Sequence, residues 1–138
     1  MGKKMYSIVF ACVGNSARSQ MAEGFARKLL PAGTKIVSAG TKPAASIDPN
    51  ALAVMKEVGI DISRQKPKML TTKMVSDATH FVSMGCGVLD SCPVPIVKGK
   101  IEIEDWELDD PKGKDIAFVR GIRDRIEQHM KNLAKKLA

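Results

Sequence analysis

Aromatic side chains and long apolar runs are both scarce in this sequence. One Trp, one Tyr and four Phe make up 4% of its 138 residues. Proteins that hold single-stranded nucleic acid stack bases on aromatic rings along a basic groove, so we expect no nucleic-acid partner. No apolar run approaches the roughly 18 residues of a membrane span, and we expect no membrane partner. The apolar stretch after Lys4 is too short for a signal peptide, which predicts a cytoplasmic protein.

Cysteine is scarce as well. The three cysteines are Cys12, Cys86 and Cys92, and in a reducing compartment they would remain thiols at rest. Together with the two histidines, His80 and His129, they show none of the spacings of a zinc site. We therefore predict no metal site, and we interpret both histidines as structural or surface residues.

The balance of charge is positive. Lys and Arg number 22 against 15 acidic residues, which gives a formal net charge of +7. Two interpretations remain open at this point: a solvated, lysine-rich surface, or a field that attracts anions. Of the possible anions, a small oxyanion fits the sequence better than nucleic acid does.

The order of apolar segments predicts a single α/β domain over residues 1–138. Short apolar runs predict buried strands at residues 6–11, 35–39 and 79–84, with a proline-containing candidate for an edge strand at 94–97. Helical spacing predicts helices at residues 19–30, at 49–59 after the N-cap Asp48, and from Asp115 to the C-terminus. Alternating strands and helices favour a Rossmann-like parallel sheet with helices on both faces.

The segment CVGNSARS, residues 12–19, links the first strand to the first helix. The first N–H groups of a helix lack intrahelical acceptors and attract anions. We expect Gly14 and Asn15 to adopt positive φ angles that fold the loop into a nest, and Arg18 to hold two oxygens of a tetrahedral anion. Such a field would lower the pKa of the Cys12 thiol and make it a nucleophile. The alternative is a buried cysteine and an arginine in a surface ion pair.

The run CVGNSARSQMAEG resembles the phosphate-binding loop of the low-molecular-weight protein tyrosine phosphatase superfamily, and more closely the arsenate reductases built on that fold. The segments VSAG, DPNALAVMKEVGIDIS, MGC…CP and DWELDDPKGK carry the resemblance over nearly the whole chain. It implies a four-stranded parallel sheet. It also implies an oxyanion-binding loop made of Cys12, Val13, Gly14, Asn15, Ser16, Ala17, Arg18 and Ser19.

The second and third cysteines favour a reductase over a phosphatase, because two thiols that form a disulfide deliver two electrons. By resemblance, Cys12 attacks the arsenic of arsenate, and Cys86 then attacks the adduct and releases arsenite. Cys92 next attacks Cys86 and frees Cys12, and an external reductant restores the thiols. We expect thioredoxin in that role, with a low-molecular-weight thiol as the alternative, and no tightly bound cofactor. Two incidental cysteines are the competing interpretation.

The segment DWELDDPKG supplies a general acid by the same resemblance, which places the acid directly before the proline, at Asp110. Asp109 would cap or orient the loop, and the competing interpretation is an ordinary turn. Lys112 and Gly113 follow where phosphotyrosine phosphatases have tyrosines, so a small inorganic anion is favoured as substrate. Phosphate and sulfate would compete with arsenate.

The resemblance also implies a support for the loop. Asn15, Glu23 and Ser38 match residues that surround a potassium ion in some members, where an acidic residue stands in place of Lys68. We expect the ammonium of Lys68 to replace that ion, so that no potassium is required. Separately, we expect the protein to be a monomer.

Two alternative functions remain open. One is a phosphatase that uses the same CX5R loop, and the other is a non-catalytic oxyanion-binding or arsenic-sensing module.

Overall fold

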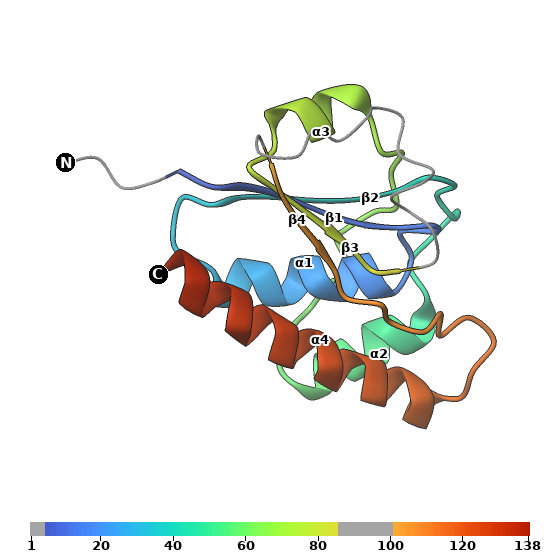
Figure 1. Ribbon diagram of the computed structural model, residues 1–138. Coiled ribbons are helices and arrows are strands. Elements are labelled where there is room, and N and C mark those ends of the chain that lie inside the picture. The colour runs from blue at the N-terminus through green and yellow to red at the C-terminus, as the bar shows by residue number, and fades with distance from the viewer. Residues whose placement is uncertain (1–4, 86–100) are drawn as a thin grey trace.

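The computed structural model describes residues 5–85 and 101–138. Its centre is a sheet of four parallel strands: β1 (Ser7–Cys12), β2 (Lys35–Gly40), β3 (His80–Ser83) and β4 (Glu102–Asp105). The strand order is β2-β1-β3-β4, so the first strand lies inside the sheet and the last lies at an edge (Figure 1). The predicted α/β class and the parallel sheet are confirmed.

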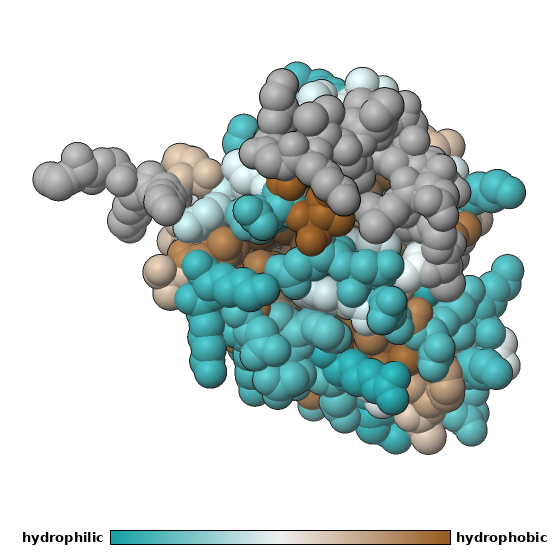
Figure 2. Space-filling view, viewed as in Figure 1, coloured by the Kyte–Doolittle hydropathy of each residue, from teal (hydrophilic) through white to brown (hydrophobic). Residues whose placement is uncertain are grey.

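Helices cover both faces of this sheet, as predicted. The helices α1 (Arg18–Leu29), α2 (Pro49–Glu57) and α4 (Ile116–Leu137) lie on one face, and the short helix α3 (Thr72–Asp77) lies on the other (Figure 1). Among the described residues, no helix is both long enough and apolar enough to cross a bilayer. Hydrophilic side chains cover the outer surface of α4 (Figure 2), as expected for an amphipathic helix that packs one face on a core.

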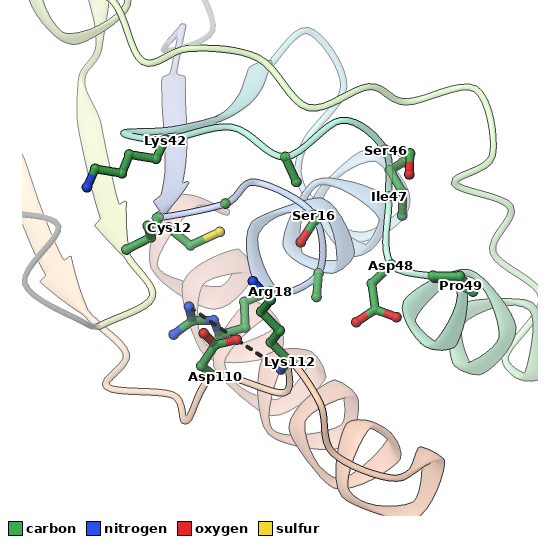
Figure 3. A pocket seen from close by; sticks show the side chains of 14 residues that line it. Cys12, Ser16, Arg18, Lys42, Ser46, Ile47, Asp48, Pro49, Asp110 and Lys112 are labelled. Carbon is green, nitrogen blue, oxygen red and sulfur yellow. Dashed lines mark hydrogen bonds and ion pairs between the residues drawn. The ribbon is translucent and has the colours of Figure 1, made fainter.

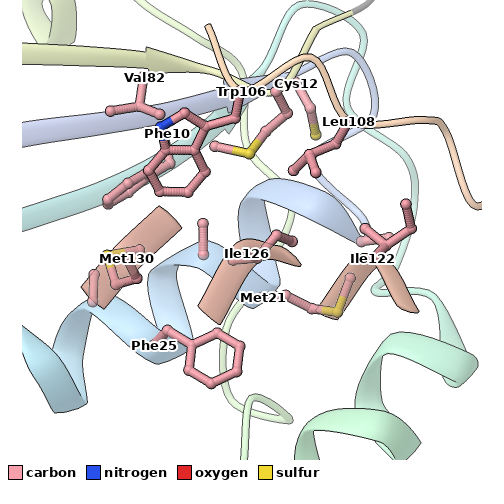
Figure 4. Packing of buried hydrophobic residues seen from close by; sticks show 14 of the residues in the cluster. Phe10, Cys12, Met21, Phe25, Val82, Trp106, Leu108, Ile122, Ile126 and Met130 are labelled. Carbon is pink, nitrogen blue, oxygen red and sulfur yellow. The ribbon is translucent and has the colours of Figure 1, made fainter. Parts of the chain in front are cut away.

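The larger core fills the space between the sheet and the helices α1, α2 and α4. Alternate side chains of β1 point to opposite faces, because side-chain direction alternates along a strand. Ile8, Phe10 and Cys12 therefore belong to this core, while Val9 and Ala11 pack in a smaller cluster on the α3 side. Figure 4 shows Phe10 and Cys12 of β1 together with buried side chains of α1 and α4.

The predicted elements agree with the structure to within about one residue for β1, α1 and β2. Asp48 caps α2 by accepting a hydrogen bond from the Asn50 N–H at 2.8 Å, and Asp115 caps α4 in the same way. The strand expected at residues 94–97 lies outside the described residues. The fourth strand of the described sheet is β4, which we did not predict, and α3 was also missed.

Topology decides where chemistry can occur in this fold. Because the strands are parallel, the carboxyl ends of β1, β2, β3 and β4 meet at the same edge of the sheet. The chain leaves β1 at Cys12, β2 at Gly40, β3 near Met84 and β4 near Trp106. Segments that are far apart in the sequence therefore come together beside the Cys12 loop.

Candidate active site

A pocket of about 500 Å³ opens at this edge of the sheet. Figure 3 shows Cys12 and Arg18 on one side of it, with Asp110 and Lys112 arriving from the segment after β4. Its lining also includes the start of α2 and the segment that precedes it. The lining residues are Cys12, Val13, Gly14, Ser16, Ala17, Arg18, Lys42, Ala44, Ser46, Ile47, Asp48, Pro49, Asp110 and Lys112.

Two polar groups contact the sulfur of Cys12, which is the last residue of β1. The hydroxyl of Ser19 lies 2.9 Å from Sγ, and the backbone N–H of Asn15 donates to Sγ at 3.2 Å. Asn15 reaches this position because its φ is +49°, which turns the loop back over the strand end. Gly14 does not have a positive φ, so our expectation for Gly14 was wrong: one left-handed residue is enough to close the loop.

The N-terminus of α1 carries no side-chain cap, although α2, α3 and α4 each have one. Its first N–H groups need acceptors, and the N-cap residue, Ala17, has no side-chain oxygen to offer them. Ser16, Ala17 and Arg18 at this end of the helix line the pocket. An anion in the pocket can therefore serve as the missing cap, since helix N-termini favour negative charge.

A second segment holds the loop in shape from outside. The backbone N–H groups of Lys42, Ala44 and Asp48 donate to the carbonyls of Val13, Gly14 and Ser16 respectively, each at 2.9 Å. The segment can approach this closely because it begins at Gly40: a Cβ there would lie 2.5 Å from the Val13 carbonyl oxygen. These three bonds engage carbonyls of the loop and so hold its backbone in one conformation beside the pocket.

Arg18 is almost fully buried, with 3% of its surface exposed. One guanidinium nitrogen donates to the carbonyl of Leu108 at 3.0 Å and to that of Met84 at 3.4 Å. The other terminal nitrogen lies 3.9 Å from a carboxylate oxygen of Asp110 (Figure 3). Arg18 thus ties α1 to the segments that follow β3 and β4, and it stands between the loop and the predicted acid.

Asp110 is 54% exposed, and its carboxylate also accepts a hydrogen bond from the Lys112 N–H at 3.0 Å. That bond belongs to the turn that the Asp-Pro sequence favours. Asp109 is exposed and does not line the pocket. The structure therefore brings Asp110, and not Asp109, to the pocket with Cys12 and Arg18.

The four residues expected to support the loop lie together behind it. The Ser38 hydroxyl donates to one carboxylate oxygen of Glu23 at 2.6 Å, and the Lys68 ammonium lies 3.9 Å from that same oxygen. The Lys68 backbone N–H donates to Oδ1 of Asn15 at 2.9 Å. Arg27 pairs with the other oxygen of Glu23 at 2.6 Å, so two cations face one buried carboxylate.

Sequence reasoning missed several members of this site. Gln20 donates to the Asn15 side chain, Gln65 donates to Gln20, and Lys42 lines the pocket. A signal for Gln20 was present: it is a polar residue next to Met21 and Ala22 on a helix that is buried throughout its first half. No comparable signal marks Gln65, because its place depends on how a distant loop folds back.

Cys86 and Cys92 lie outside the described residues. The chain leading to them is described as far as Gly85, which has φ of +97° and lies against Glu107 and Leu108. Since the Met84 carbonyl accepts a bond from Arg18, the described chain ends beside the pocket. Within residues 5–85 and 101–138, no cluster of three or more His, Cys, Asp or Glu side chains could hold a metal ion.

The two histidines lie away from the pocket. His129 stacks on Trp106 with ring centroids 4.8 Å apart, and His80 contacts the Thr79 hydroxyl at 2.9 Å. Burial lowers the pKa of both imidazoles from the usual 6.5. These contacts fit structural roles.

Comparison with known proteins connects this geometry to a family. A family model described as low molecular weight phosphotyrosine protein phosphatase matches residues 7–138. A "Glutaredoxin arsenate reductase" from Synechocystis sp. is 37% identical over 135 residues, covering 97% of this chain and all of the relative. A solved "arsenate reductase in the phosphate binding state" superimposes with a TM-score of 0.85 at 37% identity, covering 97% of this chain and 100% of that one.

A further solved structure is a thioredoxin-dependent arsenate reductase from Corynebacterium glutamicum. It has a TM-score of 0.82 and 30% identity, and the match covers 99% of this chain and 64% of that one. The resemblance drawn from the Cys12 loop thus extends to the whole domain. This chain belongs to the low molecular weight phosphotyrosine protein phosphatase family.

Proposed function

We propose that this protein reduces arsenate to arsenite, with Cys12 as the nucleophile. One observation carries the proposal: the Cys12 sulfur has two hydrogen-bonding groups within 3.2 Å and lies in the same pocket as buried Arg18 and the N-terminus of α1, which has no side-chain cap. This arrangement supports a nucleophilic sulfur that faces an anionic ligand. The names of the relatives support arsenate as that ligand.

The first step forms a bond between the Cys12 sulfur and arsenic. The thiolate attacks, one arsenate oxygen leaves as hydroxide, and Asp110 protonates it to water. Arg18 and the loop N–H groups hold the remaining oxygens. Asp110 suits this role because it lines the pocket, lies 3.9 Å from the Arg18 guanidinium and is open enough to exchange protons with solvent.

Cys86 and Cys92 carry the redox steps in this proposal. The Cys86 thiolate attacks the Cys12 sulfur, the sulfur–arsenic bond breaks, and its electron pair leaves with arsenic as arsenite. A Cys12–Cys86 disulfide remains. Cys92 then attacks Cys86, which releases the Cys12 thiolate and leaves a Cys86–Cys92 disulfide. Two thiols have been oxidised and one arsenic has gained two electrons, so the cycle balances.

An external thiol reductant must reduce that last disulfide, and we propose thioredoxin in the cytoplasm. The name of the Corynebacterium glutamicum relative supports thioredoxin, while that of the Synechocystis relative points to glutaredoxin chemistry. A low-molecular-weight thiol remains the alternative reductant.

The proposed enzyme works without a required potassium ion. The Lys68 ammonium lies 3.9 Å from the Glu23 carboxylate, and Arg27 occupies the other oxygen. A fixed ammonium beside this carboxylate supplies the positive charge that an ion would otherwise provide.

Hydrolysis of small phosphate monoesters is a second candidate activity. The family description supports it, and the same thiolate, arginine and acid perform it without Cys86 or Cys92. Among the described residues that line the pocket none is aromatic, so an aryl group would gain little from stacking on them. A non-catalytic oxyanion sensor needs neither the nucleophile nor the acid and is the weaker alternative.

Arsenate turnover with thioredoxin, thioredoxin reductase and NADPH tests the proposal, with hydrolysis of para-nitrophenyl phosphate as the parallel assay. Cys12→Ser should abolish both activities. Cys86→Ser and Cys92→Ser should each abolish arsenate turnover and leave ester hydrolysis largely intact. Turnover of arsenate by both of these variants would rule out the relay, and activity of Cys12→Ser in either assay would remove this loop from the chemistry.

A further inference from the structure

A chain of buried amides runs from the surface to the Cys12 sulfur. The Gln65 side-chain amide donates to Oε1 of Gln20 at 2.8 Å, and the Gln20 amide donates to Oδ1 of Asn15 at 3.1 Å. The Asn15 amide donates to the Ser19 hydroxyl at 2.7 Å, and that hydroxyl lies 2.9 Å from Cys12 Sγ. Asn15, Ser19 and Gln20 have no exposed surface, so water does not compete for these bonds.

Three backbone groups fix which side of each side-chain amide carries the oxygen and which carries the nitrogen. The Lys68 N–H can only donate, and it donates to the Asn15 side chain at 2.9 Å, so the atom it meets is Oδ1. The backbone carbonyls of Asn15 and Gln20 can only accept. The first takes a bond from the Gln20 amide nitrogen at 2.9 Å, and the second takes one from the Gln65 amide nitrogen at 3.0 Å. Each amide therefore has one allowed orientation.

The orientation of the Asn15 amide decides where the Ser19 hydroxyl directs its single hydrogen. Because Nδ2 of Asn15 faces Ser19, the hydroxyl oxygen accepts there, and its hydrogen is available for Cys12 Sγ. With the Asn15 amide reversed, Oδ1 would take the Ser19 hydrogen and the sulfur would lose a donor. The Asn15 N–H supplies the other donor at 3.2 Å.

We propose that Gln20, clamped by Gln65, is a positioning residue that orients Asn15 so that Ser19 donates its hydrogen to the Cys12 sulfur. Gln20 is suited to this task because its amide nitrogen holds both the side chain and the backbone carbonyl of Asn15, the one residue in the loop with a left-handed backbone. The proposal rests on the proposed role of Cys12 as nucleophile, but its test measures the thiol directly.

The test is a pH titration of the Cys12 thiolate, followed by its ultraviolet absorbance. All variants carry Cys86→Ser and Cys92→Ser, so that Cys12 is the only thiol in the chain. Ser19→Ala removes one donor to a charged sulfur and should raise the pKa of Cys12 by about one unit or more. Gln20→Met keeps the length of the side chain but cannot hold Asn15, and should raise the same pKa by roughly half a unit to one unit.

The double variant separates positioning from a general loss of structure. If Gln20 acts through Ser19, then Ser19→Ala with Gln20→Met should titrate like Ser19→Ala alone. The matched control is Gln128→Met on the exposed face of α4, which should leave the Cys12 pKa unchanged. Gln65 stands at the outer end of the series of hydrogen-bonded amides. Gln65→Met should raise the pKa of Cys12 by less than Gln20→Met does, and it replaces Gln20→Met as the test if that variant does not fold.

Unchanged pKa values in both the Gln20 and the Gln65 variants would overturn the proposal, and so would additive shifts in the double variant. Either result would leave the function proposed for Cys12 intact. Conversely, activity in Cys12→Ser would refute the proposed function whatever the titration shows.

Discussion

Gly40 allows the segment that follows β2 to press against the Cys12 loop, and replacing it with alanine should damage the site more than the fold. A Cβ at this position would lie 2.5 Å from the Val13 carbonyl oxygen and 3.0 Å from both the N and the Cβ of Asn15. Val13 O and Asn15 N are backbone atoms, so no side chain can rotate away to make room. The loop itself must move.

The size of the effect follows from that contact. Cβ atoms essentially never approach another heavy atom within 3.0 Å, so the loop and Gly40 must separate by at least about 0.5 Å (3.0 minus 2.5). The Asn15 N–H, which donates to Cys12 Sγ, moves with the loop. Overpacking costs about 1–3 kcal/mol of stability. Because a shift near 1 Å can cost roughly 100-fold in rate, we expect kcat/KM to fall about 10-fold or more.

The assay compares kcat/KM for para-nitrophenyl phosphate with the urea-unfolding midpoint of Gly40→Ala. Gly121→Ala is the matched control, since Gly121 is exposed in α4 and an added Cβ there meets nothing within 4 Å. The control should keep full activity and gain about 0.5–1 kcal/mol from helix propensity. If Gly40→Ala keeps kcat/KM within twofold of the parent, then close backbone approach at Gly40 does not shape the site.

Three further predictions concern charge. Lys112→Ala should raise KM for arsenate and for phosphate esters several-fold at low salt, and the difference should shrink as salt is added, because the lost ammonium lines the pocket; Lys135→Ala should not do so. The hydrogen bond from Arg120, followed by that from Arg123, lowers the pKa of Glu57 from 4.5 to about 2, so its contribution to stability is present above pH 4.5 and is lost as the pH falls toward 2. The difference in urea midpoint between the parent and Glu57→Gln should therefore shrink from pH 7 to pH 3, and a constant difference would contradict this linkage. Burial lowers the pKa of His129 from 6.5, so the folded state favours the neutral ring and stability declines as the pH falls below 6.5. His129→Phe keeps an aromatic ring on Trp106, and its Tm should decrease less between pH 7 and pH 5 than that of the parent. An equal decrease in both proteins would show that protonation of His129 does not destabilise the folded state.

The elements that were predicted well carry strong local signals. Buried β1 reads as a continuous apolar run, and α2 begins with Asp48 followed by Pro49. The missed strand β4 carries a weaker signal, since apolar Ile103 lies between acidic Glu102 and Glu104 at the sheet edge. The missed helix α3 has six residues, and its formation depends on the Thr71 cap and on burial of Val75 against the face of the sheet that α3 covers.

The residues of the site likewise divide into those that the local sequence indicated and those that it did not. Cys12, Asn15, Arg18 and Ser19 are neighbours in the chain, so a loop between a strand and a helix brings them together by local geometry. The sequence also indicated that Asp110 belongs to the site, but only by resemblance to a family.

Tertiary structure decided the rest. The 3.9 Å approach of Asp110 to Arg18 depends on β4 lying beside β3 at the carboxyl edge. The orientation of the Asn15 amide depends on the backbone N–H of Lys68, which donates to Oδ1 and comes from a segment beyond β2 and α2. Residues that are close in the chain are held near one another in most conformations of a short loop. Distant residues meet only after the packing of the sheet has selected one arrangement, and no local periodicity in the sequence encodes that choice.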